Sequence, residues 1–501
     1  MLPPARRLLL RAALLCLLAL PAAAETTRLT FLHLNDIYEH LPRDGHGGLA
    51  EIATLIERER GAAPGPVFLT FGGDLISPSL ASSITGGAHM IEIFNAFGTD
   101  VAVLGNHEFD FGPEVAARRI AESRFPWLGA NVLGPDGQIF GGAVATVIRQ
   151  AGPLRIGFVG VLTGSTARVS NAPGITFLPE VQAVQEAAAA LRAAGVDLVV
   201  ALTHLDLEQD KEIQRRAGVD LVLGGHDHDP AALLEGGALV LKAGSDAFWL
   251  GVVELSVEKQ PGQRARIASI GWRMLPNAGI PPSPAIAPLV AAVETKLHAA
   301  LGERLATLAA PLDSRTAMVR GREAAIGDLF ADALRAHLGA DVALINGGGL
   351  RGNREYPAGH ALTRRDLVAE APFGNVVMLL EATGEELRRL LENGVSEVEN
   401  LDGRFPQISG MSFTYDPRAP RGRRVREVRV GGQPLREDRR YRLATTDYLY
   451  AGKDGYELMA QLPVLVDASG AMLLVTVVAE AVQRADTLDI RPDGRIRALA
   501  P

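Results

Sequence analysis

The chain has 501 residues, of which 47% are hydrophobic and 22% charged, and this apolar fraction excludes a mostly disordered protein. Its length predicts at least two hydrophobic cores, while a single cysteine excludes both a disulfide framework and a zinc site built from cysteines. The net charge of −8 and an aromatic content of only 5% argue against a nucleic-acid partner, which would require excess Lys and Arg or stacking rings.

Residues 1–24 have the pattern of a secretory signal peptide. Arg6, Arg7 and Arg11 form a basic segment, Leu8–Leu20 is apolar apart from Arg11, and Ala22-Ala23-Ala24 is a suitable cleavage site. The apolar stretch is shorter than the ~18 residues that a membrane anchor needs, and no later run reaches that length. The Ala/Arg-rich, Lys-poor composition is typical of bacteria. We therefore expect a periplasmic or secreted protein without a membrane anchor.

Short, β-branched apolar runs alternate with helix-like stretches between residues 25 and 275. Such runs are typical of strands buried on both faces, and their alternation with helices predicts an α/β layered fold. Helices are expected at Ala50–Arg60 and Val181–Ala194. The expected strands are Leu29–Leu34, Val67–Phe71, Val101–Leu104, Ile156–Val161, Leu198–Leu202 and Leu221–Leu223.

A proline-rich stretch marks a domain boundary. Leu275–Pro288 contains five prolines and a glycine, so it cannot form a regular element. Ala291–Leu308 is expected to be a helix that bridges to a second, mixed α/β domain. The predicted organisation is a signal peptide at 1–24, a first domain at 25–275, a linker with the bridging helix at 276–309 and a second domain at 310–501.

Polar side chains follow five of the expected strands. Because ligands bind beyond the carboxyl ends of the strands in open α/β sheets, we expect these side chains to meet at one sheet edge. Imidazoles and carboxylates together suit zinc, iron, cobalt or manganese, and one shared carboxylate would hold two ions roughly 3.5–4 Å apart. A single such residue is more often a helix cap or a satisfied core group, but five in order favour a metal centre. The five blocks are Asn35-Asp36, Gly72-Gly73-Asp74, Gly105-Asn106-His107-Glu108, Thr203-His204 and Gly224-Gly225-His226-Asp227-His228.

These blocks, the third continuing through Phe109-Asp110, resemble those of the calcineurin-like metallophosphoesterases. Within that superfamily the chain is similar, over essentially its whole predicted mature length, to the secreted two-domain 5′-nucleotidase / UDP-sugar hydrolase / 2′,3′-cyclic phosphodiesterase family. The resemblance implies a layered β-sandwich flanked by helices, followed by a mixed α/β substrate-binding domain.

The resemblance also implies two divalent metal ions (Mn, Zn, Co or Fe) and a role for each polar side chain. His107 and Asp110 would form a catalytic dyad in which Asp110 orients the imidazole. The nucleophile would be a water or hydroxide on the metals. The implied metal ligands are the bridging Asp74, then Asn106, His204 and His226 for one ion, and Asp36 and His228 for the other.

The first block departs from the family pattern, which has Asp-x-His where this chain has Asp36-Ile37-Tyr38. Three hypotheses stay open. Tyr38 binds iron as a phenolate, as in the purple acid phosphatases of the same superfamily; His40 takes the place of the missing imidazole; or the first metal site is weaker. We expect Tyr38 to lie near the metal, either as a ligand or as a ring packed over the site.

Three segments of the second half resemble the nucleotide-binding domain of the same family, although each alone has an ordinary structural interpretation as a turn or a core ring. They are Asn346–Arg351, Ala371–Asn375 and Asp447–Tyr456. The implied substrate residues are Phe373 and Tyr448 stacking on the base, Asp454 on the ribose, Asn346 on the base side, and Arg351 and Arg320 on the phosphate. Arg322 is a near alternative to Arg320, and the family usually has Phe at the position of Tyr448.

The function expected from this pattern is that of a metal-dependent phosphohydrolase, in first place a 5′-nucleotidase that acts on small-molecule nucleotides as a monomer or homodimer. A UDP-sugar hydrolase or a 2′,3′-cyclic-nucleotide phosphodiesterase is the alternative within the family. Phe373 and Tyr448 argue against a third possibility, a sulfate-thiol hydrolase, whose substrate is carried by another protein. Asn106, His107 and Asp110 argue against a non-enzymatic nucleotide-binding protein with a damaged metal site.

Overall fold

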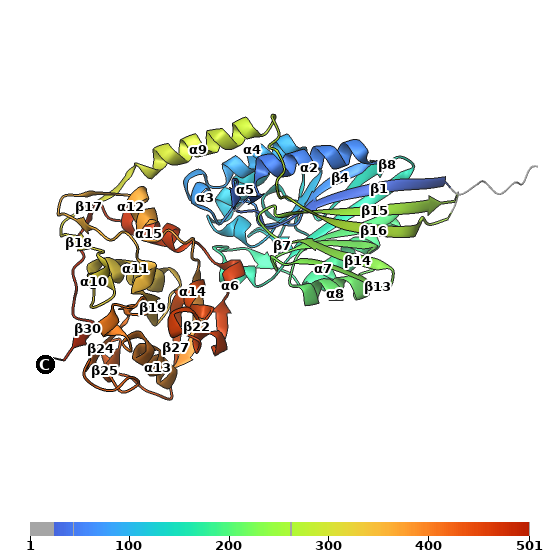
Figure 1. Cartoon of the computed structure of the whole chain (residues 1–501). Helices are drawn as coiled ribbons and strands as arrows, with labels where there is room; N and C mark the ends of the chain where they lie inside the picture. The colour runs from blue at the N-terminus through green and yellow to red at the C-terminus, as the bar shows by residue number, and fades with distance from the viewer. Residues whose placement is uncertain (1–24, 44, 261–262, 500–501) are drawn as a thin grey trace, which may run out of the picture.

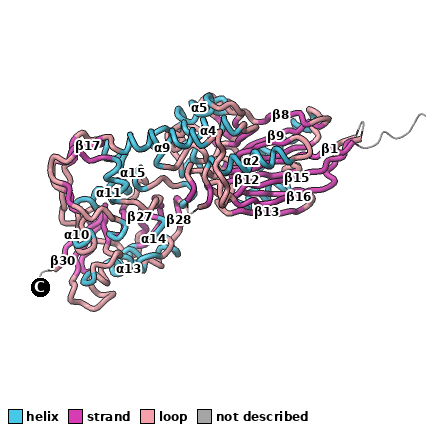
Figure 2. The backbone as a smooth tube through the Cα atoms, turned by 45° about the horizontal axis from the view of Figure 1, so that its top comes forward, coloured by secondary structure: helices cyan, strands magenta, loops and turns pink. Residues whose placement is uncertain are grey.

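The computed structural model describes residues 25–499 except 44 and 261–262, so the predicted signal peptide lies outside the described residues. Two lobes are joined along helix α9 (Ala287–Leu301), which spans them in both views (Figures 1 and 2). We call the described residues up to 286 the N-terminal lobe and those from 304 onward the C-terminal lobe. No helix among the described residues is long and apolar enough to cross a membrane.

Two six-stranded sheets form the centre of the N-terminal lobe. In spatial order the first consists of β16 (Arg266–Pro276), β15 (Trp249–Lys259), β1 (Glu25–Leu34), β4 (Val67–Phe71), β5 (Val101–Val103) and β6 (Trp127–Leu128). The second consists of β13 (Pro230–Glu235), β14 (Ala238–Ala243), β12 (Leu221–Gly225), β11 (Leu198–His204), β9 (Leu154–Leu162) and β8 (Thr146–Ala151). Within each sheet the central strands run parallel, because helices connect them.

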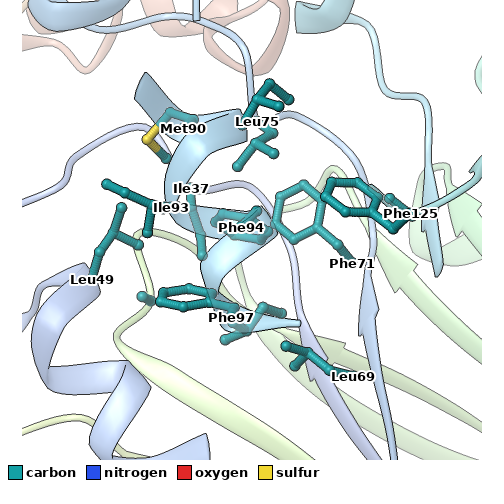
Figure 3. Packing of buried hydrophobic residues seen from close by; sticks show 14 of the residues in the cluster. Ile37, Leu49, Leu69, Phe71, Leu75, Met90, Ile93, Phe94, Phe97 and Phe125 are labelled. Atoms are coloured by element: carbon teal, nitrogen blue, oxygen red, sulfur yellow. The ribbon is translucent and has the colours of Figure 1, made fainter. Parts of the chain in front are cut away.

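The sheets pack face to face, and helices cover both outer faces. The layer between the sheets is apolar and includes Phe31 of β1 and Phe158 of β9, whose ring centroids lie 6.3 Å apart. The first sheet is covered by α2 (Leu49–Ala62), α3 (Leu80–Thr85), α4 (Ala88–Phe97) and α5 (Pro113–Glu122), and the second by α7 (Glu180–Ala193) and α8 (Leu207–Arg216). Figure 3 shows Phe94 of α4 packed against Phe71 of β4, with ring centroids 4.8 Å apart. The predicted layered β-sandwich flanked by helices is confirmed.

The expectation of a single sheet edge was wrong. Three of the polar strand ends, those of β1, β4 and β5, belong to the first sheet, and those of β11 and β12 belong to the second. The strands of both sheets end at the same end of the sandwich, so the five blocks still converge. Periodicity identifies buried strands but does not assign them to one of two facing sheets, since both faces of each sheet are apolar.

The C-terminal lobe is built around a five-stranded mixed sheet. In order it contains β23 (Pro406–Ser409), β19 (Val342–Asn346), β27 (Arg440–Thr446), β22 (Val377–Thr383) and β28 (Val464–Val466). Smaller sheets combine β21 (Ala361–Thr363) with β17 (Arg304–Leu308) and β29 (Thr487–Leu488), and β26 (Gln433–Pro434) with β25 (Val425–Val430), β24 (Met411–Tyr415) and β30 (Ile496–Ala498). Its longer helices are α11 (Ala325–His337), α12 (Arg364–Glu370), α13 (Gly384–Gly394) and α15 (Leu474–Gln483).

The bridging helix is shorter than the sequence suggested. We expected helix over Ala291–Leu308, but α9 ends at Leu301 and residues 304–308 form β17. This strand pairs with β21 and β29, and Leu305, Ala306 and Leu308 are buried there. Tertiary pairing therefore overrides a local sequence that is compatible with helix.

The lobes meet at two small cavities beside the end of the sandwich. One, of about 400 Å³, includes Asp110 and His337; the other, of about 230 Å³, includes His226 and Val464. Between the two cavities, α6 (Thr166–Val169) packs against the turn Ala468–Gly470. The contact is close: a Cβ built on Gly470 would lie 2.7 Å from Val169 Cβ. Figure 2 shows β28 on the side of the C-terminal lobe that faces the N-terminal lobe.

Replacing Phe94 by Ala should destabilise the N-terminal lobe by about 3–5 kcal/mol, because the ring is 1% exposed and packs against both Phe71 and Phe97. Urea denaturation followed by tryptophan fluorescence isolates this lobe, since all three tryptophans (127, 249 and 272) lie in it. Leu234→Ala, at a 57% exposed position, is the matched control and should change the unfolding free energy by less than about 0.5 kcal/mol. Equal midpoints for the two variants would contradict this account of the core.

Candidate active site

The loops that follow the five strands adopt an unusual backbone conformation. Asp36, Asp74, His226 and His228 have φ values of 52°, 64°, 85° and 61°, in the left-handed region that non-glycine residues rarely occupy. Each such residue costs on the order of 1–3 kcal/mol and persists only where the surrounding structure imposes it. Four strained positions on three loops therefore indicate that side-chain placement here has been kept at the expense of stability.

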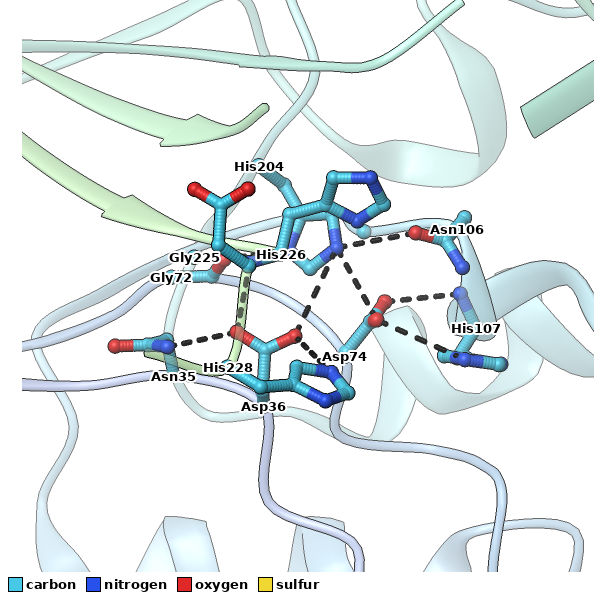
Figure 4. Close-up of polar contacts among 12 residues, drawn as sticks. Asn35, Asp36, Gly72, Asp74, Asn106, His107, His204, Gly225, His226 and His228 are labelled. Carbon is cyan, nitrogen blue, oxygen red and sulfur yellow. Dashed lines mark hydrogen bonds and ion pairs between the residues drawn. The ribbon is translucent and has the colours of Figure 1, made fainter. Parts of the chain in front are cut away.

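Two carboxylates and an imidazole form the centre of the site (Figure 4). His204 Nε2 lies 3.1 Å from Asp74 Oδ2 and 4.0 Å from Asp36 Oδ1, and all three side chains are completely buried. One ligand atom from each of the three residues lies within 4.8 Å of the other two. Asn106 Oδ1 is 3.1 Å from the same His204 nitrogen, and His204 Nδ1 is held 2.8 Å from the carbonyl oxygen of Gly72.

The remaining predicted imidazoles border this centre. His228 Nε2 lies 3.3 Å from Asp36 Oδ1. The ring centroid of His226 is 5.0 Å from that of His204, and its buried Nδ1 makes no hydrogen bond to any described residue. The backbone N–H of His226 donates to Asp36 Oδ2 at 2.8 Å, which ties the fifth block to the first.

The charges of the cluster are unbalanced. Within the part of the chain that the structure describes, Asp36 and Asp74 form ion pairs only with imidazoles. Burial opposes the charge on His204, but the carboxylates of Asp74 and Asp36 outweigh it and raise its pKa to about 9. Burial likewise opposes ionisation of both carboxyls, yet His204 keeps the pKa of each below its ordinary value. Two buried carboxylates together with imidazole nitrogens and an amide oxygen are a donor set that fits divalent cations.

His107 and Asp110 form a close pair at the edge of the cluster. His107 Nδ1 lies 2.6 Å from Asp110 Oδ2, and the two residues are joined by a 3₁₀ turn over His107–Phe109. His107 Nε2 is 4.0 Å from Asp74 Oδ2, and the His107 backbone N–H donates to Asp74 Oδ1 at 2.9 Å. The carboxylate thus fixes the ring so that its second nitrogen is directed toward the cluster.

The structure distinguishes between the two candidates for the missing first-block imidazole. The Tyr38 hydroxyl lies within 3.3 Å of Asp36 Oδ1, Asp74 Oδ2 and His228 Nε2. His40 Nε2 instead pairs with Glu294 of α9, at 2.7 Å, so the structure favours Tyr38 over His40 at this position. Burial first, and then the carboxylates, raise the pKa of Tyr38 well above its ordinary value, so its phenol is neutral.

Two residues that support the cluster were not assigned a role from the sequence. Glu108 accepts hydrogen bonds from the backbone N–H groups of residues 74, 75, 76 and 105, and burial followed by the charge of Asp74 raises its pKa to about 7. Asn35 donates to Asp36 Oδ2 and accepts from the N–H of Ala243 in β14. Both residues occur within the five sequence blocks. Their hydrogen bonds to the backbone of distant segments cannot be recognised from the spacing of residues along the chain.

In the C-terminal lobe five of the six predicted substrate residues fall into two connected groups. Asp454 accepts from Asn346 Nδ2 at 2.8 Å and from the Tyr448 hydroxyl at 2.9 Å. The Arg351 guanidinium lies over the Phe373 ring, 5.6 Å from its centroid. Among the described residues, Arg320 joins neither group by a hydrogen bond. Burial raises the pKa of Asp402, but hydrogen bonds and charge from Arg404, and then the charge of Arg320, bring it below its ordinary value.

The two aromatic rings belong to segments that are joined by a side-chain hydrogen bond. Asn375, two residues after Phe373, donates to Asp447, the residue before Tyr448, at 2.9 Å. Phe373 is 60% exposed and Tyr448 37%. Two large exposed rings therefore lie on segments that a hydrogen bond joins.

The two cavities between the lobes do not bring the two groups of predicted residues together. The interlobe cavities reach Asp110 and His226 on the N-terminal side. On the C-terminal side they are lined by His337, Leu338, Val377, Leu379, Arg442, Val464, Leu465, Val466, Asp467, Gly470, Ala471, Met472, Glu480 and Arg484. None of the six predicted substrate residues is among them.

Comparison with known proteins agrees with this architecture. Residues 29–230 match the family model of calcineurin-like phosphoesterases, and residues 304–461 match that of the 5′-nucleotidase C-terminal domain. A 5′-nucleotidase from Bos taurus is 28% identical over 551 aligned residues, which cover 99% of this chain and 94% of that protein.

Solved structures support the same assignment. A 5′-nucleotidase precursor from Thermus thermophilus superposes with a TM-score of 0.57 at 27% identity, covering 95% of this chain and 100% of that one. An NAD nucleotidase from Haemophilus influenzae, 19% identical, superposes with a TM-score of 0.78 over 95% of this chain and 100% of its own, which shows a shared fold. The chain therefore belongs to the two-domain 5′-nucleotidase family of calcineurin-like phosphoesterases and is a metal-dependent phosphoric ester hydrolase.

Proposed function

We propose that the protein is a periplasmic or secreted 5′-nucleotidase that hydrolyses nucleoside monophosphates to nucleoside and phosphate. The observation that carries the proposal is the pair of buried carboxylates, Asp36 and Asp74, facing His204 beside the His107–Asp110 pair. The secreted location rests on the signal-like sequence of residues 1–24. The proposal assigns catalysis to a domain at 25–275 and nucleotide binding to a domain at 310–501, with 276–309 between them.

Two divalent ions, of Mn, Zn, Co or Fe, fit the donor set. Asp74 would be one of their ligands, and the Tyr38 hydroxyl lies 3.3 Å from its Oδ2. Such ions would polarise a phosphoryl oxygen and make water acidic enough to attack phosphorus. The residues that would hold them are Asp36, Asp74, Asn106, His204, His226 and His228.

His107 is placed to assist the leaving group. With Asp110 Oδ2 held 2.6 Å from Nδ1, the imidazole keeps one orientation. Nε2 can then donate a hydrogen bond to the phosphate or a proton to the departing ribose oxygen. A positively charged ring at this edge would also offset the negative charge of the substrate.

The C-terminal lobe supplies recognition. Stacking between Phe373 and Tyr448 would hold any nucleobase, since every base has a flat face, and would contribute about 1–3 kcal/mol per ring. Asp454 is positioned by Asn346 and Tyr448 to accept hydrogen bonds from ribose hydroxyls. Arg351 and Arg320 would contact the phosphate, for which a planar guanidinium is suited.

Catalysis by both lobes requires them to reorient. In the present arrangement the C-terminal lobe presents β28 and the turn Ala468–Gly470 to the catalytic residues, while the exposed rings lie outside the interlobe cavities. Rotation at the connection between α9 and β17 would bring the rings to the centre. The same centre could attack UDP-sugars or 2′,3′-cyclic nucleotides, and a substrate panel decides between them.

Phosphate release from AMP should require a divalent metal and His107. Addition of Mn²⁺ to protein treated with EDTA should restore activity, and His107→Ala should reduce kcat by at least roughly 100-fold, the usual contribution of a general acid. His298→Ala, at a side chain 72% exposed on α9, is the control and should leave kcat unchanged. AMP hydrolysis that persists in EDTA, or in the His107 variant, would refute the proposed centre.

Removal of either exposed ring should affect nucleotides selectively. Phe373→Ala and Tyr448→Ala should each raise KM for AMP by roughly 5- to 150-fold, which corresponds to the loss of one stacking contact. Hydrolysis of p-nitrophenyl phosphate, which carries no base, should be unaltered. Trp272→Ala, at a ring 47% exposed on the N-terminal lobe, controls for the loss of any surface aromatic. Equal losses on both substrates would show that the rings do not bind the base.

Locking the observed lobe arrangement should stop nucleotide turnover. A disulfide between Val169→Cys and Gly470→Cys is feasible because the two Cβ positions need to separate by only about 1 Å to reach bonding distance. Oxidation of the double variant should lower AMP turnover at least roughly tenfold, and reductant should restore it, if domain motion gates the reaction. Each single cysteine variant is a control. An unchanged rate after complete oxidation would show that no reorientation is needed.

A further inference from the structure

Lys242 places an ammonium group in the interior of the N-terminal lobe. It lies on β14 and is only 1% exposed, and the preceding residues 239–241 of the same strand are apolar and fully buried. Its Nζ donates to the carbonyl oxygens of Leu205, at 2.6 Å, and Gly225, at 2.8 Å. It also forms ion pairs with Asp227 and, at 2.9 Å, with Asp210.

The four oxygen partners come from the segments that carry the imidazoles of the centre. Leu205 directly follows His204, and Gly225 directly precedes His226. Asp227 lies between His226 and His228. Asp210 belongs to α8, which begins two residues after Leu205. One cation therefore joins the end of β11 to the loop after β12, and all three imidazoles lie within one residue of a group that it holds.

The space around this ammonium is specific for it. Gly224 is the register partner of Lys242, and a Cβ at Gly224 would approach Asp210 Oδ2 to 2.8 Å and Lys242 Cε to 3.2 Å. A side chain at 224 would thus displace the ion pair. Burying an ammonium costs several kcal/mol unless its partners are well placed, so an apolar side chain would serve the packing of β14 better.

We propose that Lys242 is a positioning residue that fixes the His204 segment relative to the His226–His228 loop and thereby sets metal affinity. The inference rests on the proposed metal centre. Without the ammonium, two carbonyl oxygens and two carboxylates would face one another unpaired, and the loops would separate. Partners that orient metal ligands in this way typically contribute 10- to 100-fold to metal affinity.

The same lobe contains a matched control. Lys259, on β15, donates to Asp197 at 2.9 Å and to the Pro153 carbonyl oxygen at 3.1 Å. Its side chain is 31% exposed, and its partners carry no candidate ligand. Lys242 and Lys259 thus make similar bonds, but only those of Lys242 reach the centre.

The test measures Mn²⁺ affinity directly, by competition with a chelating dye, for the full mature chain and three variants. Lys242→Met should raise the Kd for Mn²⁺ roughly 10- to 100-fold. Asp227→Asn removes the negative charge of one partner without changing its shape and should also raise Kd, by a smaller factor. Lys259→Met should keep the wild-type Kd. At saturating Mn²⁺, kcat for AMP in the Lys242 variant should return to within about threefold of wild type, because binding rather than chemistry is impaired.

A wild-type Kd for Mn²⁺ in both Lys242→Met and Asp227→Asn would overturn the proposal, as would an equal increase in Lys259→Met. If Lys242→Met does not fold, the Asp227→Asn value alone decides. Thermal unfolding of each variant in EDTA distinguishes a purely structural role from the proposed one. A purely structural role would lower the unfolding temperature without altering the Kd for Mn²⁺. A wild-type protein that binds Mn²⁺ but does not hydrolyse AMP would refute the nucleotidase proposal and leave the affinity test of Lys242 in force.

Discussion

The close approach of two buried carboxylates, Asp36 and Asp74, is the constraint on which the rest of the N-terminal lobe depends. Like charges without solvent repel, so the fold must hold them together with other groups. Asn35 and the His226 N–H bind one carboxylate, and the His107 N–H binds the other. Left-handed backbone at both aspartates adds strain to the electrostatic cost. A protein selected for stability alone would place neutral side chains here, so the arrangement indicates a functional centre, and its donor set fits divalent cations.

The sandwich explains how such a centre can be rigid. Three of its loops come from the first sheet and two from the second, and the apolar layer between the sheets fixes the distance between them. The hydrogen bond from His226 N–H to Asp36 then crosses from one sheet to the other. Glu108 serves the same purpose within the first sheet, where its two oxygens collect four backbone N–H groups of the Asp74 and Gly105 turns. Ligand geometry is therefore imposed by groups that cannot themselves reach a metal.

The sequence predicts the local elements and the polar blocks but not the long-range contacts that position them. The buried strands were predictable because short runs of Val, Ile and Leu, such as Leu198–Leu202, are typical of strands buried on both faces. The polar residues that follow these strands were predictable because they recur after five strands in order. The assignment of strands to two sheets was not, because a strand buried on both faces carries no mark of its partner. Helix α9 was overextended because pairing of β17 with distant strands decides its end. Tyr38 and His40 are both four residues or fewer from Asp36, and only the position of Glu294 on α9 shows which of them turns away.

The separation of the lobes gives substrate binding an energetic task beyond recognition. A ligand can shift a conformational equilibrium only by the difference in its affinity for the two states. Two stacking contacts of about 1–3 kcal/mol each are comparable with the roughly 5.5 kcal/mol needed to raise a conformation from 1% to 99% of the molecules. Binding the base between Phe373 and Tyr448 could therefore offset the contacts of α6 with the Ala468–Gly470 turn, provided that the rings close on the base only in the reoriented state. Exposed rings on one lobe and a buried, charged centre on the other would then be two parts of one mechanism, in which part of the base's binding energy is used to assemble the active site.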